Sequence, residues 1–152
     1  MRRRKRLAGI LALVVAFLAI SALLARALSE PEAERSEITA LINEEARGDT
    51  NAMLNRITSC RTNPACVARV TSVAKALTRS GSVSILEINT STGFALSGGV
   101  GTARVAWKTP ITLPIVQCIR VRRTGDALTG LHAELIELSE RIPSSHDCPA
   151  SF

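Results

Sequence analysis

Aromatic side chains are almost missing from this chain. Of its 152 residues none is tyrosine, one is tryptophan and three are phenylalanine. Proteins that bind single-stranded nucleic acid stack the bases on aromatic rings, so this scarcity argues against base recognition. The sequence also has no G-x-S-x-G, G-x-G-x-x-G or P-loop motif. It therefore predicts neither a serine hydrolase of the nucleophile-elbow type nor a nucleotide-binding enzyme.

Acidic residues are absent from the first 28 positions. Six of the 19 Lys and Arg residues lie there, so the remaining 13 stand against 13 Asp and Glu residues in positions 29–152. The formal charge of +6 thus belongs to the N-terminal segment, and the rest of the chain is neutral. A neutral domain lacks the basic surface that nucleic acid requires, so no nucleic-acid partner is expected.

Charge of either sign is missing from Leu7 to Ala25, a run of 19 residues. As a helix this run is about 28 Å long, close to the ~30 Å hydrocarbon core of a bilayer. Five basic residues precede it, which holds the N-terminus in the cytoplasm. We expect residues 1–28 to form a basic tip and a single-pass membrane anchor, with an extracytoplasmic domain after it. The alternative is a secreted protein, cleaved at the A-x-A-like site that ends at Ala27.

Residues 31–79 carry helical signals. A helix is predicted to begin at Pro31 and to end at Gly48, a second to follow a cap at Asp49 or Thr50, and a third to begin at Asn63 and Pro64. Apolar residues recur every three or four positions in all three. On the first helix the apolar stripe is Ile38, Leu41, Ile42 and Ala46, and the opposite, exposed face is Glu34, Arg35, Glu37, Glu44 and Arg47.

The periodicity changes to alternation after Gly81. Four strands are predicted within residues 82–142: one over Val83–Ile88, one from Phe94 to Lys108 with a bulge near Gly99, one over Ile115–Arg123, and one over Leu131–Ile142. A turn is expected at Gly125. Residues 29–142 are therefore interpreted as one α+β domain, three helices packed on a curved four-stranded antiparallel sheet, and residues 143–152 as a C-terminal tail.

Three stretches carry a resemblance to a known superfold: GTARVAWK (101–108), LPIVQCIRVRRTG (113–125) and LHAELIELSERI (131–142). The layout is similar to the cystatin-like, NTF2-like superfold and to small membrane-anchored extracytoplasmic proteins of the actinobacterial type. The resemblance implies an N-terminal helical layer inside a curved sheet. It implies no catalytic residues, because the acid or His–Asp pair of the isomerase and dehydratase branches has no counterpart here.

Four cysteines in an exported domain predict two disulfides. Proximity favours Cys60–Cys66, which brackets the link between the second and third helices, and leaves Cys118–Cys148, which ties the tail to the third strand. A zinc site is disfavoured because no C-x2-C pair is present. We expect no metal and no cofactor.

The candidate functional residues are few. One face of the predicted sheet carries a basic row that suits an anionic partner. A cavity between helices and sheet, if present, would be lined by four apolar residues. The pair His132 and Glu134 shares a strand face and is interpreted as an exposed polar pair more readily than as an acid/base pair. The basic row is Arg104, Lys108, Arg120 and Arg122, and the cavity lining is Phe94, Val105, Trp107 and Ile119.

The sequence predicts a non-enzymatic binding or scaffolding module of the cell envelope. The expected partners are the membrane and an envelope protein or an anionic envelope component. The alternative from another class is a binder of small apolar ligands, or a lyase- or isomerase-like enzyme, that uses the cavity.

Overall fold

The structure is a computed structural model of the whole chain. It describes residues 2–91, 97–126, 130–149 and 152, and within these ranges it leaves out the side chains of residues 2–8, 23, 26–31, 97–98, 126 and 130–131. Helices come first along the chain and four strands follow. The predicted α+β class with a four-stranded antiparallel sheet is confirmed.

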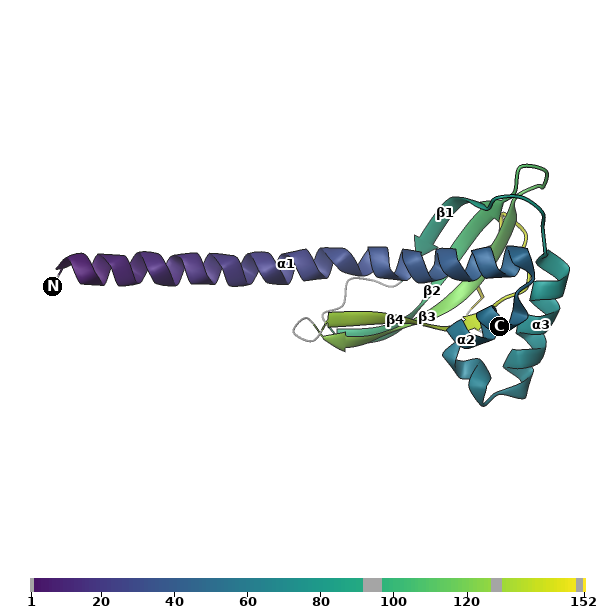
Figure 1. Cartoon of the computed structure of the whole chain (residues 1–152), viewed down its shortest axis with the longest axis horizontal. Helices are drawn as coiled ribbons and strands as arrows, with labels where there is room; N and C mark the ends of the chain where they lie inside the picture. The colour runs from purple at the N-terminus through teal and green to yellow at the C-terminus, as the bar shows by residue number, and fades with distance from the viewer. Residues whose placement is uncertain (1, 92–96, 127–129, 150–151) are drawn as a thin grey trace.

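One long helix, α1 (Arg2–Arg47), forms the first third of the chain. The prediction of a separate helix that begins at Pro31 is wrong, because the helix continues through this residue (Figure 1). A proline removes one backbone donor, but the residues on both sides are rich in Ala, Leu, Glu and Arg, which favour helix.

The first half of α1 projects from the rest of the molecule (Figure 1). Its large apolar side chains, from Ile10 to Leu24, are between 48 % and 73 % exposed. Within the parts of the chain that the structure describes, no helix is both long enough and apolar enough to cross a membrane.

The predicted end of α1 at Gly48 is confirmed. Gly48 has φ +69°, a left-handed conformation that suits glycine. The Gly48 and Asp49 N–H groups donate to the Glu45 and Glu44 carbonyls at 2.8 and 2.9 Å, the pattern of a Schellman cap. The chain therefore turns sharply at this point into the next helix.

Two short helical elements and one longer helix follow α1. They are α2 (Thr50–Arg56), the 3-10 helix η1 (Thr58–Arg61) and α3 (Pro64–Leu77). The predicted caps are confirmed: the Asp49 carboxylate accepts from Ala52 N–H, and the Asn63 side chain accepts from Ala65 N–H, each at 3.0 Å.

The sheet is a meander with the order β1-β2-β3-β4, every pair antiparallel. The predicted bulge near Gly99 is confirmed by a register shift between Ser97 and Gly99. Residues 92–96, where the predicted second strand begins, lie outside the described residues. The strands are β1 (Ser84–Thr90), β2 (Ser97–Lys108), β3 (Ile115–Asp126) and β4 (Gly130–Leu138).

The C-terminal ends of β3 and β4 differ from the prediction by three residues or more. β3 continues through Gly125, which has φ +102° and pairs with Leu131 instead of starting a turn. β4 ends at Leu138 and not at Ile142: the Ser139 N–H still donates to the Cys118 carbonyl, but the Cys118 N–H donates to the Ser139 hydroxyl at 2.8 Å, which stops the ladder. Ile142 returns to β3 through a single bridge to Val116.

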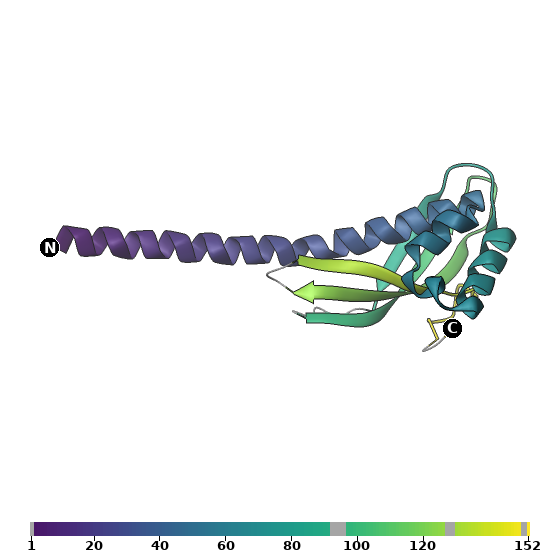
Figure 2. The ribbon, with the colours of Figure 1, turned by 60° about the horizontal axis from the view of Figure 1, so that its bottom comes forward.

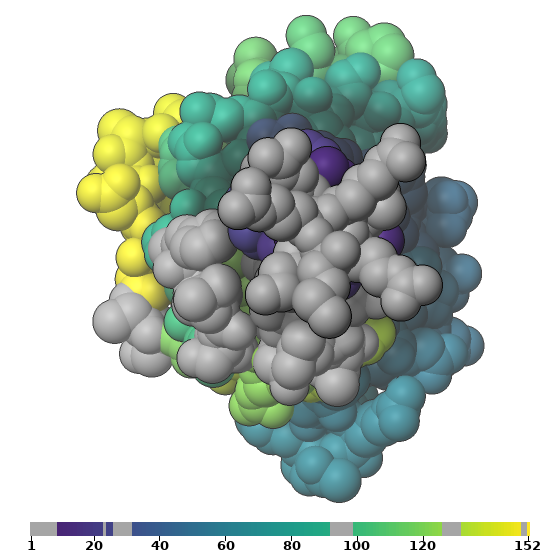
Figure 3. Space-filling view, turned by 90° about the vertical axis from the view of Figure 1, so that its left-hand side faces the viewer, coloured from purple at the N-terminus to yellow at the C-terminus, as the bar shows by residue number. Residues whose placement is uncertain are grey.

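The core lies between α1 with its neighbouring helices and one face of the sheet (Figure 2). The face of α1 that packs on the sheet includes Glu34, Ile38, Leu41 and Glu45, at spacings of four, three and four. The predicted exposure of Glu34 and Glu44 is wrong, since their exposed fractions are 1 % and 7 %. The other face of the sheet carries the C-terminal tail. Seen from the N-terminal end, the yellow tail and the blue helical residues occupy opposite flanks (Figure 3).

Candidate functional site: the outer face of the sheet

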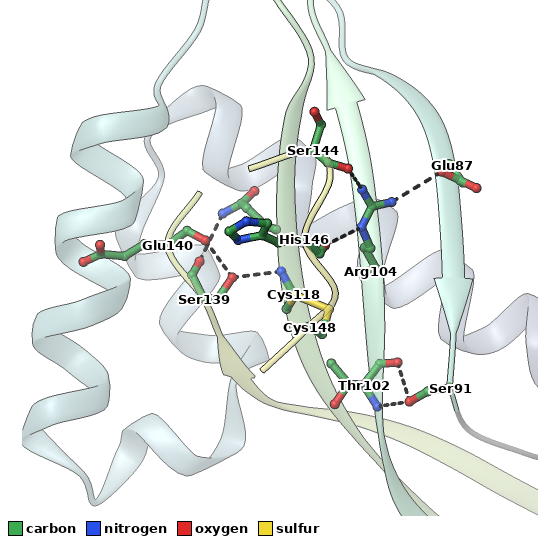
Figure 4. Close-up of a disulfide and its surroundings, with 11 residues drawn as sticks. Glu87, Ser91, Thr102, Arg104, Cys118, Ser139, Glu140, Ser144, His146 and Cys148 are labelled. Atoms are coloured by element: carbon green, nitrogen blue, oxygen red, sulfur yellow. Dashed lines mark hydrogen bonds and ion pairs between the residues drawn. A yellow bond between two sulfur atoms is a disulfide. The ribbon is translucent and has the colours of Figure 1, made fainter. Parts of the chain in front are cut away.

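The outer face of the sheet is the side away from α1, and the predicted Cys118–Cys148 disulfide lies on it. The bond is present, with the two Cα atoms 5.7 Å apart. Cys118 is fully buried although it points away from the core, because the tail covers it. Figure 4 shows the tail crossing β3 beside this disulfide, with the backbone carbonyls of Ser144 and His146 turned toward Arg104. The tail is therefore a fixed part of this face.

Arg104, the first residue of the predicted basic row, holds the tail in place. Its guanidinium donates to the Ser144 carbonyl at 2.5 Å and to the His146 carbonyl at 3.3 Å, and it lies 3.6 Å from the Glu87 carboxylate (Figure 4). These three acceptors come from β1 and from the tail. Arg104 therefore contributes to the fold, and its charge is already compensated within the molecule.

Arg120, the third residue of the row, is also paired. Its Nη1 donates to the Glu137 carboxylate on β4 at 2.8 Å, and its guanidinium carbon lies 5.2 Å from the centre of the Phe152 ring. A cation over an aromatic face is a favourable contact. Arg120 thus joins the last residue of the chain to the sheet.

Lys108 and Arg122 are the exposed members of the row. Lys108 is the last residue of β2, opposite Ser84, whereas Arg122 lies opposite Glu134 near the other end of the sheet. The predicted row is therefore not one continuous basic surface. It consists of two residues that bind the tail or β4 and two exposed residues at opposite ends of the sheet.

The second predicted disulfide, Cys60–Cys66, closes the turn between η1 and α3 with a Cα–Cα distance of 4.9 Å. Next to it, the Ser59 hydroxyl donates to the Ile136 carbonyl of β4. Arg56 donates to Glu44 and Glu37 of α1, each at 2.7 Å, and these two bonds raise the pKa of Arg56 against the opposing effect of burial. These contacts fasten α2 and η1 to α1 and β4.

Two acidic residues lie inside the molecule. Glu34 accepts two hydrogen bonds from Arg123 of β3, at 2.6 and 3.0 Å. Glu45 is fully buried, and among the described residues neither of its carboxylate oxygens makes a well-formed hydrogen bond. Burial raises the pKa of Glu45 to about 8, and the nearby Gln117 amide and Arg79 charge oppose this rise.

Sequence reasoning missed both acids as buried groups, yet a signal was present. Glu34 and Glu45 continue the three- and four-residue spacing of Ile38 and Leu41, which places all four on one side of a helix. A carboxyl group with a raised pKa suits proton transfer. Glu45 is 0 % exposed, however, so in this structure a substrate from solvent does not reach its carboxyl group.

The predicted cavity lining belongs to this core. Val105, Trp107 and Ile119 are each 0 % exposed and belong to the central apolar cluster. The Trp107 indole donates to the Gln117 side-chain oxygen at 2.9 Å. Phe94, the fourth predicted residue, lies outside the described residues. The three that are described fill the space that an apolar ligand would need.

The remaining predicted groups lie at the surface. His132 and His146 are exposed, and Glu134 is half-buried opposite Arg122. In the described part of the chain, no three His, Cys, Asp or Glu side chains are close enough together to hold a metal ion. Among the described residues, the structure therefore brings Arg104 and Arg120 together with the tail, and it leaves His132 and Glu134 apart from them on β4.

The fold and these contacts define a class: a small α+β domain with two disulfides, built on a long N-terminal helix. No protein-family model matches the chain, and neither a curated protein nor a solved structure is similar enough to count as a relative.

Proposed function

We propose that this protein is a binding module without chemistry of its own, tethered to the outer surface of the cell membrane. One observation carries the proposal: a single helix joins an uncharged apolar run, with basic residues before it, to a domain that two disulfides close. Apolar side chains that extend from a domain into water are unfavourable, and insertion of Leu7–Ala25 into lipid removes that cost. The length of this run is taken from the sequence, since the structure leaves out the side chains of residues 7, 8 and 23 within it.

The disulfides support the extracytoplasmic location. Disulfides persist in oxidising compartments and are rare in the cytosol, and all four cysteines of the chain are paired. The basic residues Arg2–Arg6 favour a cytoplasmic N-terminus. Both features place the domain on the far side of the membrane from its N-terminus.

The continuity of α1 also bears on the orientation of the domain relative to the membrane. Because no break separates the apolar run from the packed part of the helix, the domain has no flexible linker and keeps a fixed tilt relative to the lipid surface. The end of the sheet where β3 ends and β4 begins points along α1 toward the N-terminus (Figures 1 and 2), so this end faces the membrane. The arrangement of α1 against the sheet also supports the proposal that the domain resembles the cystatin-like, NTF2-like superfold.

An envelope protein or an anionic envelope component is the proposed partner of the outer face. Of the four basic residues, Lys108 and Arg122 are the exposed ones, and only these two can meet a partner without releasing the tail or β4. Charge reversal at these two positions is expected to weaken binding. The same change at Arg104 or Arg120 would instead disturb the fold.

A topology experiment tests the proposal. A reporter that is active only outside the cytoplasm is fused after Phe152 and expressed with the full chain, and membranes are then extracted with alkaline carbonate. The expected result is an active reporter that stays in the membrane pellet. An active reporter in the medium, on a protein whose mass shows that it begins at Leu28, would identify the secreted alternative. An inactive reporter would reject both forms.

A further inference from the structure

A groove of about 810 Å³ runs between α1 and the edge strand β1, on a surface separate from the basic row. Its helix wall is a side of α1 different from the side that packs on the sheet. The residues of this wall are mostly small and polar, and they recur every three or four positions. The helix wall consists of Glu32, Arg35, Ser36, Thr39, Ala40 and Asn43, and the strand wall is Ile85–Asn89.

The strand wall is the edge of β1 and not one of its faces. Five consecutive residues border the groove, whereas a strand presents only alternate residues on one face. β1 is the first strand of the sheet and pairs only with β2. Among the described residues, no backbone hydrogen bond joins Ile85–Asn89 to any segment other than β2. The outward backbone N–H and C=O groups of this edge therefore face the groove.

The two walls match in length. From Glu32 to Asn43 a helix rises about 16 Å, and from Ile85 to Asn89 a strand extends about 13 Å. An extended segment of about four or five residues fits this length. The small side chains of Ser36 and Ala40 leave room for a backbone to lie beside the helix.

We propose that this groove binds a short extended segment of a partner protein, which adds to the sheet as a strand next to β1. The main chain of the guest would pair with the free edge of β1, the mode known as β-strand addition. Leu86 lies at a register shift of β1 and is 50 % exposed, so it offers an apolar contact for one guest side chain. The groove has little net charge, since Glu32 and Arg35 are both on its wall and Glu87 lies 3.6 Å from Arg104. Recognition therefore depends on backbone pairing and not on charge.

A second copy of this chain is a poor occupant. Antiparallel pairing of two β1 edges requires a two-fold axis roughly perpendicular to the sheet, and this axis would point the two α1 helices in opposite directions. Two copies anchored in one membrane cannot adopt that arrangement. Only the exclusion of a second copy depends on the proposed membrane anchor. The groove itself is the same in a tethered or a released protein.

The test uses the full chain in detergent micelles and a phage library of random linear octapeptides as the probe. Peptides that bind the wild-type protein are synthesised, and their Kd values are measured for two variants. Ser36→Trp places a bulky side chain in the groove, whereas Ser72→Trp makes the same change at an exposed position on α3. We expect Ser36→Trp to weaken binding at least tenfold and Ser72→Trp to leave Kd within twofold.

Backbone pairing is tested with N-methylated versions of the selected peptide, one position at a time. Strand addition predicts an alternating pattern, in which methylation of every second amide weakens binding at least tenfold and methylation of the others is tolerated. Equal tolerance at all positions, or a selection that yields no peptide sensitive to Ser36→Trp, would overturn the assignment. Neither outcome bears on the reporter experiment, so the membrane proposal stands or fails separately.

Discussion

Glu45 is a carboxyl group in surroundings that disfavour its charge. It is fully buried beside the core, and its pKa is raised from 4.5 to about 8. Since the folded protein binds this proton more tightly than the unfolded chain does, the contribution of Glu45 favours folding most at low pH. Stability is therefore expected to fall as the pH rises from about 4.5 to about 8.

The substitution Glu45→Gln should remove this pH dependence. We expect the variant to be more stable than the wild type by about 2–3 kcal/mol at pH 7, and nearly equal to it at pH 4.5, because the neutral amide replaces a charge that the core disfavours. Urea unfolding at several pH values measures the effect. Glu140→Gln, at an exposed site, serves as the control. A Glu45→Gln variant that keeps the wild-type slope of stability against pH would contradict the argument.

Arg123 and Arg122 are neighbours on β3 with opposite environments. Arg123 makes two hydrogen bonds to buried Glu34, whereas Arg122 is exposed. Removal of one partner of a buried ion pair costs about 3–5 kcal/mol, because the other charge stays buried. Arg123→Ala should therefore lower the free energy of unfolding by about 3 kcal/mol, and Arg122→Ala should change it by less than about 0.5 kcal/mol.

Chemical denaturation measures the free energy of unfolding of Arg123→Ala and Arg122→Ala and so tests both expectations. The double substitution Glu34→Gln with Arg123→Met should recover part of the loss, since it leaves no buried charge. If Arg122→Ala and Arg123→Ala destabilise the protein equally, the buried pair has no special role.

At the scale of elements, the two disulfides act on segments of different length. Cys60–Cys66 closes a loop with a sequence separation of 6, and Cys118–Cys148 one with a separation of 30. In the chain-entropy model these crosslinks stabilise the fold by about 2 and about 4 kcal/mol. Replacing Cys118 and Cys148 together, by Ala and Ser, should therefore cost more than the same change at Cys60 and Cys66.

The mobility of the C-terminal tail can be measured in the same disulfide variants. Without Cys148 the described part of the tail keeps the hydrogen bonds to Arg104 and the contacts of Ile142 and Phe152 with β3. Amide hydrogen exchange of residues 118 and 142 should become faster in the Cys118–Cys148 variant and stay unchanged in the Cys60–Cys66 variant. Equal exchange rates in both would show that the tail does not depend on its disulfide.

The end of a helix or strand can be predicted from the sequence where its hydrogen-bond partners lie only a few residues away. Asp49, Asn63 and Gly48 cap helices as predicted, because a cap needs only groups within a few residues. The end of β4 does not follow such a rule. It is set by the bond between Ser139 and Cys118, a partner 21 residues away, which no local pattern indicates.

For the whole molecule, the N-terminal half of α1 is the segment on which the membrane proposal depends. Leu18 is 59 % exposed on this part of the helix. An arginine at the centre of a membrane helix costs about 2.5–3.5 kcal/mol on the insertion scale. Leu18→Arg should therefore lower the fraction of protein in the carbonate-resistant pellet severalfold, while Leu18→Ala should not. An unchanged pellet fraction for Leu18→Arg would contradict membrane insertion of this segment.

The sequence by itself determined the class of fold, the helix caps and both disulfides. Helical and strand periodicities and short loops are properties of neighbouring residues, and four cysteines leave a single remaining pair once the local one is chosen. Tertiary structure decided the rest. It made α1 one helix through Pro31, buried Glu34 and Glu45, used Arg104 to hold the tail, and left a groove beside β1. The physical reason is that each of these depends on which distant segment meets a given side chain, and the energies of such contacts are not encoded in local spacing.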